Sequence, residues 1–434
     1  MIVPSTKPDK QPAVPGQAND PLPLRAANFL GDTIDAIDTL ARRYDEGPRA
    51  SMRGGTAGAK PTRLVQKHAK RKRDRHAKTK VAFFHYSYYD IAFKFFIEQV
   101  LDAECVAVGE PTRRTLEIGA AESNDYVCAP FKHILGDYIE ALEAGADVLV
   151  QFTGPCRLGY YGELQESILR DMGYEFEMLN FAEIAGKPLK EYIDVCKKKV
   201  NPSLSVAQGV KGILAAFKMV ECLDAYNDRF LALAGFDRVK GESLRARERF
   251  FEDMGACKTR RDVEEAFQKG MDELESIERD KPEGALRIGI VGEYYTAVVP
   301  HSNLEVERKL LDMGVELGRM LNITARNLRY DEPALRRTVS DYISYDAGPT
   351  STLTVAAAKR YAEEGFDGIV HLKSAGCTPE IDCMPALQRI SREYRVPVLF
   401  LSYDSQTSDT GLDTRLEAFY DMIAMRKAHD EQRR

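Results

Sequence analysis

Short apolar runs alternate with helical segments in two separate stretches of the chain, and this alternation constrains the fold more than any other feature. In the first stretch, the runs VAFFHY, CVAVGE, ADVLVQF and YEFEMLNF have the character of strands. Segments with helical spacing, such as YYDIAFKFFIEQVL and ELQESILRDMG, separate them. Because strands that alternate with helices form mostly parallel sheets, residues 80–187 are predicted to fold as a Rossmann-like α/β half.

The second stretch repeats this construction over residues 285–434. Its predicted strands and helices lie in ALRIGIVGEYY, SNLEVERKLLDMGVELGRML, FDGIVHL, MPALQRISREY, VPVLFLSY and DTRLEAFYDMIAMRK. Residues 188–284 contain long amphipathic patterns almost without strand runs and are predicted to form a helical bridge. Two Rossmann-like parallel-sheet halves of this kind leave a crevice at the carboxyl ends of their strands, where open α/β folds bind ligands.

Residues 1–79 differ from the rest of the chain, because they are rich in Pro, Gly, Ala, Lys and Arg. We expect a mostly disordered basic tail, with one short helix in NFLGDTIDAIDTLARRY. From Lys60 to Lys80 there are ten Lys and Arg residues against one acid, Asp74. A solvated tether is the favoured interpretation, and an anionic partner such as nucleic acid or an acidic protein is the alternative.

The bulk properties narrow the class of protein. A chain of 434 residues with 44% hydrophobic residues can build two cores, and its net charge of −6 argues against a surface built around nucleic acid. There is no uninterrupted apolar run of about 18 residues and no secretory leader pattern, so we expect a cytoplasmic protein without a membrane anchor. Its eight cysteines are then reduced thiols or metal ligands rather than disulfides.

Three cysteines lie in segments that contain Pro or Gly: Cys128 in DYVCAPFKHILGD, Cys156 in QFTGPCRLGYYGE and Cys377 in HLKSAGCTPEIDCMP. Cys156 and Cys377 directly follow predicted strands and could face each other across the crevice. Thiolates are soft ligands suited to iron–sulfur clusters, and such loops let backbone N–H groups approach the sulfur atoms. Spacing alone leaves zinc binding and ordinary packing open. The cysteines predicted only to pack are Cys105, Cys196, Cys222 and Cys257.

Several polar residues near these loops are weaker candidates for function. Cations close to the cysteines could compensate the charge of a cluster: Lys132, His133, Arg157 and Lys373. Glu380 could move a substrate proton or complement a helix dipole. The remaining candidates are Tyr160 and Tyr161 as cavity or packing residues, His301 in a loop after a strand, and Gly348 with Pro349 at a helix start that binds an anion or is simply capped.

Two segments carry a resemblance to a known family. VCAPFKHILGDYIEALEAGADVLVQFTGPCRLGYYGELQESILRDMG and SAGCTPEIDCMPALQRISREYRVPVLFLSYDSQTSDTGLDTRLEAFYDMI resemble the 2-hydroxyacyl-CoA dehydratase superfamily. The chain is most similar to the branch related to CoA-substrate-specific enzyme activases and double-cubane-cluster proteins. The resemblance spans about residues 81–430 and is weak across 188–282.

The resemblance implies a cluster at the junction of the two halves, held by three cysteines. Matched motif by motif, these ligands are Cys128, Cys156 and Cys377. The cofactor is then a [4Fe–4S] cluster with one iron open, or a double cubane that uses more thiolates. Cys383 is the best-placed extra ligand, although packing at a helix start explains it equally well.

The implied function is low-potential reduction or radical dehydration of an acyl-CoA or another small molecule. A separate ATP-dependent activator supplies the electron in this family, and the chain itself has no G-x-x-x-x-G-K-[ST] phosphate loop. A homo- or heterodimer is also expected by resemblance, and no catalytic residue is assigned. One departure is that related activases are far longer chains with a fused ATPase. The alternatives are a non-catalytic electron carrier or accessory subunit, and a scaffold without a cluster.

Overall fold

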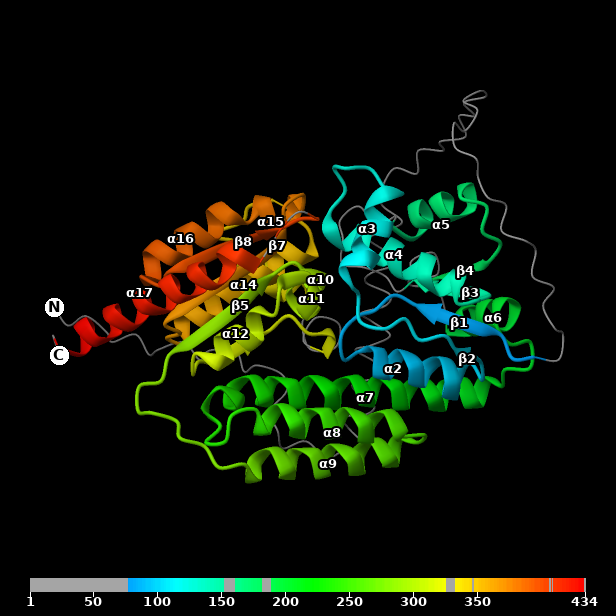
Figure 1. Cartoon of the computed structure of the whole chain (residues 1–434), viewed down its shortest axis with the longest axis horizontal. Helices are drawn as coiled ribbons and strands as arrows, with labels where there is room; N and C mark the ends of the chain where they lie inside the picture. The colour runs from blue at the N-terminus through cyan, green and yellow to red at the C-terminus, as the bar shows by residue number, and fades with distance from the viewer. Residues whose placement is uncertain are drawn as a thin grey trace, which may run out of the picture.

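The computed structural model describes residues 77–151, 161–181, 189–324, 332–345, 347–405, 407 and 409–432. Within them lie two four-stranded parallel sheets side by side, above a layer of long helices (Figure 1). The predicted α/β class with two parallel-sheet halves is therefore confirmed. The basic tail and its expected helix lie outside the described residues.

The first sheet has the strand order β2-β1-β3-β4, with every neighbouring pair parallel. Its central strand β3 is completely buried because all four of its residues, VLVQ, face protein on both sides of the sheet. The predicted strand CVAVGE is shorter than expected, since β2 ends at Cys105. The elements are β1 Lys80–Phe83, α2 Asp90–Phe95, a π-helix at Phe96–Val100, β2 Glu104–Cys105, α3 Arg113–Ala121, α4 Ala129–Glu143, β3 Val148–Gln151, α5 Tyr161–Asp171 and β4 Glu177–Asn180.

The second sheet repeats the same topology, with the order β6-β5-β7-β8. The prediction of a loop at His301 is wrong, because Pro300 begins the short helix α11. The elements are β5 Arg287–Gly292, α10 Tyr294–Val298, α11 Pro300–Asn303, α12 Val306–Asp312, β6 Glu316–Arg319, α13 Glu332–Val339, α14 Pro349–Glu363, β7 Gly368–Ser374, α15 Thr378–Asp382, α16 Met384–Tyr394, β8 Val398–Tyr403, a 3-10 helix at Asp409–Gly411 and α17 Leu412–Gln432.

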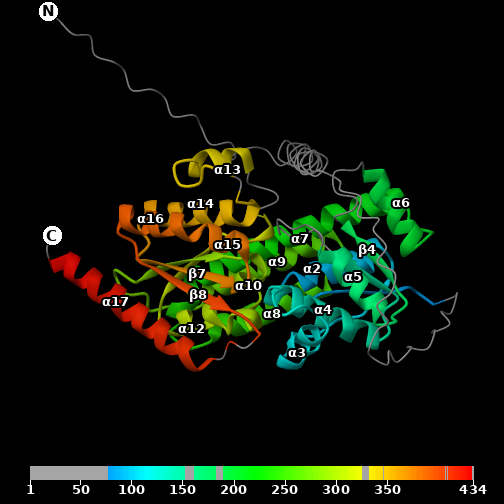
Figure 2. The same ribbon diagram turned by 90° about the horizontal axis from the view of Figure 1, so that it is seen from above.

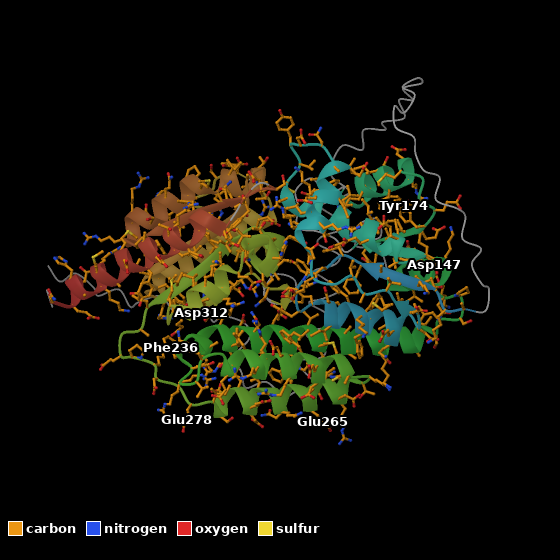
Figure 3. All side chains as sticks on the ribbon, viewed as in Figure 1. Asp147, Tyr174, Phe236, Glu265, Glu278 and Asp312 are labelled. Atoms are coloured by element: carbon orange, nitrogen blue, oxygen red, sulfur yellow. The ribbon has the colours of Figure 1, made fainter. Side chains whose placement is uncertain are left out.

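Helices separate the two sets of strands in the sequence: α6 Leu189–Lys199, α7 Val206–Leu233, a 3-10 helix at Ala234–Phe236, α8 Glu242–Ala256 and α9 Arg260–Ser276. The long helix α7 runs beneath both sheets (Figure 1). Glu265 and Glu278 lie on the side of this layer that faces away from the sheets (Figure 3). No helix in the described ranges is long and apolar enough to cross a lipid bilayer.

Asp224 of α7 ties this layer to both halves. Its carboxylate accepts hydrogen bonds from the Tyr88 hydroxyl at 3.0 Å and from the Thr324 backbone N–H at 2.8 Å, and also from the Tyr89 hydroxyl. Tyr88 and Tyr89 precede α2, whereas Thr324 follows β6. A buried carboxylate with several donors of this kind fixes the relative position of the parts that supply them.

The two halves also share a hydrophobic core. Tyr295 and Val299, at α10 of the second half, pack in one cluster with Phe84 and Phe131 of the first. Helices α10 and α4 accordingly lie next to the junction in both ribbon views (Figures 1 and 2). The junction is therefore a packed interior surface on which polar side chains can be held in place.

Candidate functional site

Cys128 precedes the first turn of α4 at the junction. Its backbone is extended, and Pro130 favours the start of the helix directly after it. The Cys128 thiol is partly buried and contacts the hydroxyl of Tyr161, the first residue of α5. The sequence alone did not decide whether Tyr161 packs in the core or lines a cavity. In the structure it contacts a candidate cluster ligand.

Cys377 also directly precedes a helix, in the second half, where it lies between β7 and α15. Burial is the largest cause of a raised pKa of the Cys377 thiol, followed by the nearby Glu293 and Glu380 carboxyls. The Cys128 thiol is close enough to raise this pKa further, while the Glu380 backbone hydrogen bond acts in the opposite direction. The structure therefore brings Cys128 and Cys377 into one site, where Cys377 is a neutral thiol in the absence of a metal.

Backbone contacts hold the two cysteine loops together. The N–H of Ala129 donates to Oγ of Ser374 over 3.0 Å, which satisfies one of the free donors of the first turn of α4. A Cβ atom on Gly376 would lie 3.4 Å from the Tyr126 carbonyl oxygen and 3.9 Å from Cα of Cys128. The loops are thus in direct contact. Cys156, Arg157 and Tyr160 lie outside the described residues.

A second group of potential ligands lies directly behind Cys377. Nε2 of His371, in β7, is 2.8 Å from Oε2 of Glu380, and Sγ of Cys383 is 3.5 Å from the same oxygen. All three side chains are completely buried, and their potential ligand atoms lie within 4.8 Å of one another. Burial and the Glu380 carboxylate raise the pKa of Cys383. These residues form a donor set that a metal ion could use, and their hydrogen bonds also explain them as a buried polar cluster.

Glu380 is more deeply buried than the sequence indicated. It lies in the first turn of α15, as expected, but its carboxylate contacts His371 and accepts a hydrogen bond from the Thr354 hydroxyl at 3.3 Å. Sequence reasoning missed His371. The signal that could have identified it is a histidine in the middle of GIVHLKS, a strand whose other central residues are apolar.

The expected charge compensation is only partly present. Lys132 is buried and donates from Nζ to the Asp125 carbonyl oxygen over 3.1 Å, and Lys373 is also buried. Burial, together with His301 and His85, lowers the pKa of His133 to about 4. His133 is therefore neutral at pH 7 when no cluster is bound, and its compensation of a cluster's negative charge stays a prediction.

Further polar residues at the junction escaped the sequence analysis. His85 contacts Asp90 through Nδ1 and Oδ2 at 2.6 Å, and its backbone N–H donates to Oδ2 of Asp137 at 3.0 Å. Tyr295 lies near this group, since the Asp137 and Asp90 carboxyls raise its pKa after burial. A signal was present in HILGDYIEAL, where Asp137 interrupts an otherwise apolar helix face.

The remaining described cysteines are packed thiols, as predicted. Burial raises the pKa of Cys105 to about 12 and that of Cys196, Cys222 and Cys257 to about 11. None of the four is available as a thiolate at neutral pH, and all four are free of disulfides.

Comparison with known proteins supports the resemblance carried by the sequence. Residues 253–423 match the family described as 2-hydroxyglutaryl-CoA dehydratase, D-component. This segment contains Cys377, His371 and Glu380, together with all four strands of the second sheet. A comparison with curated protein sequences gives no match. The matched segment is thus similar to a component of the 2-hydroxyacyl-CoA dehydratase superfamily.

Proposed function

We propose that the protein binds an iron–sulfur cluster through Cys128, Cys156 and Cys377 at the junction of its two sheets. We further propose that it uses the cluster for low-potential reduction or radical dehydration of a 2-hydroxyacyl-CoA or a related acyl-CoA. The single observation that supports this most strongly is the meeting of the Cys128 and Cys377 loops, joined by a hydrogen bond between residues 245 positions apart.

The donor set fits such a cluster. Cys128 and Cys377 offer soft sulfur ligands, and each lies just before a helix, where exposed N–H groups favour negative charge. Deprotonation of Cys377 is unfavourable without a metal, because burial and two carboxyls oppose it. A bound metal reverses that balance, since a coordinating thiol is deprotonated outright. This predicts that the site is loaded by metal rather than used as a free nucleophile.

Three cysteine ligands are preferred over four. Cys383 is completely buried, and its thiol donates to the backbone oxygen of Glu380 at 3.3 Å. Its recruitment would require loss of this contact and would bring a second anionic sulfur beside Glu380. A three-cysteine set leaves one iron open to substrate, which favours catalysis over a purely electron-carrying role.

The cluster supplies one electron at low potential to the substrate, and the protein's own residues bind and orient that substrate. An electron donor is needed for this chemistry, and we propose that a separate ATP-dependent activator protein fills this role. The family relationship of residues 253–423 supports such a partnership, along with a second dehydratase-type subunit.

The test is anaerobic purification of the full chain, followed by iron and acid-labile sulfide analysis and EPR of the reduced protein. We expect about four iron and four sulfide per chain in the wild type for a single cubane. Cys128→Ser and Cys377→Ser should lose most of both, as should Cys156→Ala. Cys105→Ser is the matched control, because its thiol is partly exposed and packs away from the junction.

Two results would refute the proposal. One is a wild-type protein free of iron under strict anoxia. The other is an unchanged EPR signal in both Cys128→Ser and Cys377→Ser.

A further inference from the structure

Three buried side chains between α4 and α10 each carry a polar atom without a hydrogen-bond partner in the described part of the chain. These atoms are Nδ1 of His133, Oδ1 of Asp137 and the hydroxyl of Tyr295. The side chains are only 3%, 0% and 4% exposed. A buried polar atom left unpaired costs free energy, so three of them together indicate an occupant that pairs with them.

The three atoms belong to one place. The rings of His133 and Tyr295 lie 5.8 Å apart between their centroids. Asp137 follows His133 by four residues on α4, which places both on the same face of the helix. After burial, the Asp137 carboxyl makes the largest contribution to the raised pKa of Tyr295. These residues therefore lie together between the first half and α10 of the second, and we call the region around their unpaired atoms the polar space.

The surroundings of this space determine the charge of its occupant. The groups whose charges act on the three residues are His85, Asp90, Glu140, Glu293, His301 and Tyr86. No lysine or arginine of the described ranges is among them. Burial lowers the pKa of His133 to about 4, so this side chain is neutral at pH 7, and burial raises the pKa of Asp137, which favours its protonated, uncharged form. The space therefore favours an uncharged group that both donates and accepts hydrogen bonds, and it disfavours an anion.

The polar space adjoins the cysteine site on two sides. His133 and Cys128 belong to the same end of α4, about one turn and a half apart. Glu293 accepts a hydrogen bond from the Tyr295 backbone N–H at 2.9 Å, and its charge acts on Cys377. A molecule bound at the cysteines would thus lie beside the polar space.

We propose that His133, Asp137 and Tyr295 form the subsite for the hydroxyl group of a 2-hydroxyacyl thioester. The hydroxyl donates its hydrogen to Nδ1 of His133 and accepts hydrogen bonds from Tyr295 and Asp137. This assignment rests on the proposed function for its substrate class and adds the residues that distinguish a 2-hydroxyacyl group from an unsubstituted acyl group.

The test compares the binding of 2-hydroxyglutaryl-CoA and glutaryl-CoA, which differ in this hydroxyl, by calorimetry with the anaerobically purified full chain. We expect the wild type to bind the hydroxylated ligand about ten-fold more tightly, the value of one hydrogen bond to a buried group. Tyr295→Phe should bring this ratio close to one without changing the affinity for glutaryl-CoA. Because the Tyr295 hydroxyl has no hydrogen-bond partner among the described residues, its removal should leave folding intact.

Asp137→Asn is a second variant: its amide keeps the size of the side chain and can still donate where a protonated carboxyl donates, so it should retain the wild-type ratio. Tyr126→Phe is the matched control, since this tyrosine is 93% exposed beside Cys128 and should leave the ratio unchanged.

An unchanged ratio in Tyr295→Phe would overturn the assignment. Equal affinities of the wild type for the two ligands would also overturn the assignment, because the polar space would then hold water alone. Failure of both ligands to bind would overturn it as well. Iron and sulfide content measured in the same preparations reports separately on the proposed function. A failed subsite is therefore distinguishable from a failed cluster.

Discussion

The backbone N–H of Ala129 donates a hydrogen bond to Oγ of Ser374 over 3.0 Å, joining the start of α4 to the end of β7. Both residues are buried, and each lies close to a candidate cluster ligand, Cys128 or Cys377. One side-chain oxygen thus satisfies a helix N-terminus in the other half of the molecule. This bond keeps the two cysteine loops at a fixed separation.

Ser374→Ala should lower the free energy of unfolding by about 1–3 kcal/mol, because it leaves the Ala129 N–H buried and unpaired. Urea denaturation measures the change. Ser276→Ala is the control, since the Ser276 hydroxyl also makes a hydrogen bond, which it donates to the Glu273 carbonyl oxygen at an exposed helix end. Equal effects of the two substitutions would contradict the importance of the junction bond.

Gly292→Ala should destabilise the second half by more than about 3 kcal/mol, a loss typical of strained and overpacked backbone. Gly292 has a φ of 139°, and an added Cβ would lie 1.8 Å from the Leu372 carbonyl oxygen. Gly255→Ala, in α8 with nothing within 4 Å, should instead stabilise the protein by about 0.5–1 kcal/mol. Thermal unfolding of both variants measures these opposite effects. An unfolding temperature of Gly292→Ala equal to that of the wild type would contradict the prediction.

The free energy of unfolding should fall as the pH is lowered, because His133 is buried as a neutral side chain. Its pKa is about 4 in the folded protein against an ordinary 6.5, so the unfolded chain binds this proton first as the pH decreases. Folding therefore loses up to about 3 kcal/mol between pH 6.5 and pH 4. His133→Gln should remove this loss, and denaturation at several pH values would show the two stability curves converging toward low pH. Parallel curves would argue against a buried neutral His133.

Glu380→Ala should cost about 3–5 kcal/mol, since it leaves His371 buried without its partner. Glu393→Ala is the control, because Glu393 pairs with Arg389 on the exposed face of α16 and should have little effect. Denaturant unfolding distinguishes the two. A small effect at Glu380 would mean that His371 finds another partner in the variant.

The sheets could be predicted from the sequence because strands such as VLVQ and GIVHLKS are buried on both faces and therefore appear as apolar runs. The positions of Cys128 and Cys377 followed from the same patterns and from the family motifs. The α11 helix at His301 was missed, since four residues carry no periodic signal.

The buried polar groups of the junction could not be predicted. His85, Asp137 and Tyr295 come from three separated segments, and only the tertiary fold brings them together. His85 and Asp137 each interrupt an apolar run, and by itself each resembles a surface residue. His371 was missed for the same reason: its partner Glu380 lies nine residues further along the chain, and only the fold brings the two side chains together.

The central claim is that Cys128 and Cys377 hold one iron–sulfur cluster between the two halves. Iron, sulfide and EPR measurements on the anaerobically purified protein test it most directly. The account predicts a cluster in the wild type and in Cys105→Ser, and its loss in Cys128→Ser and in Cys377→Ser. An iron-free wild type, or a full cluster in both junction variants, would contradict it.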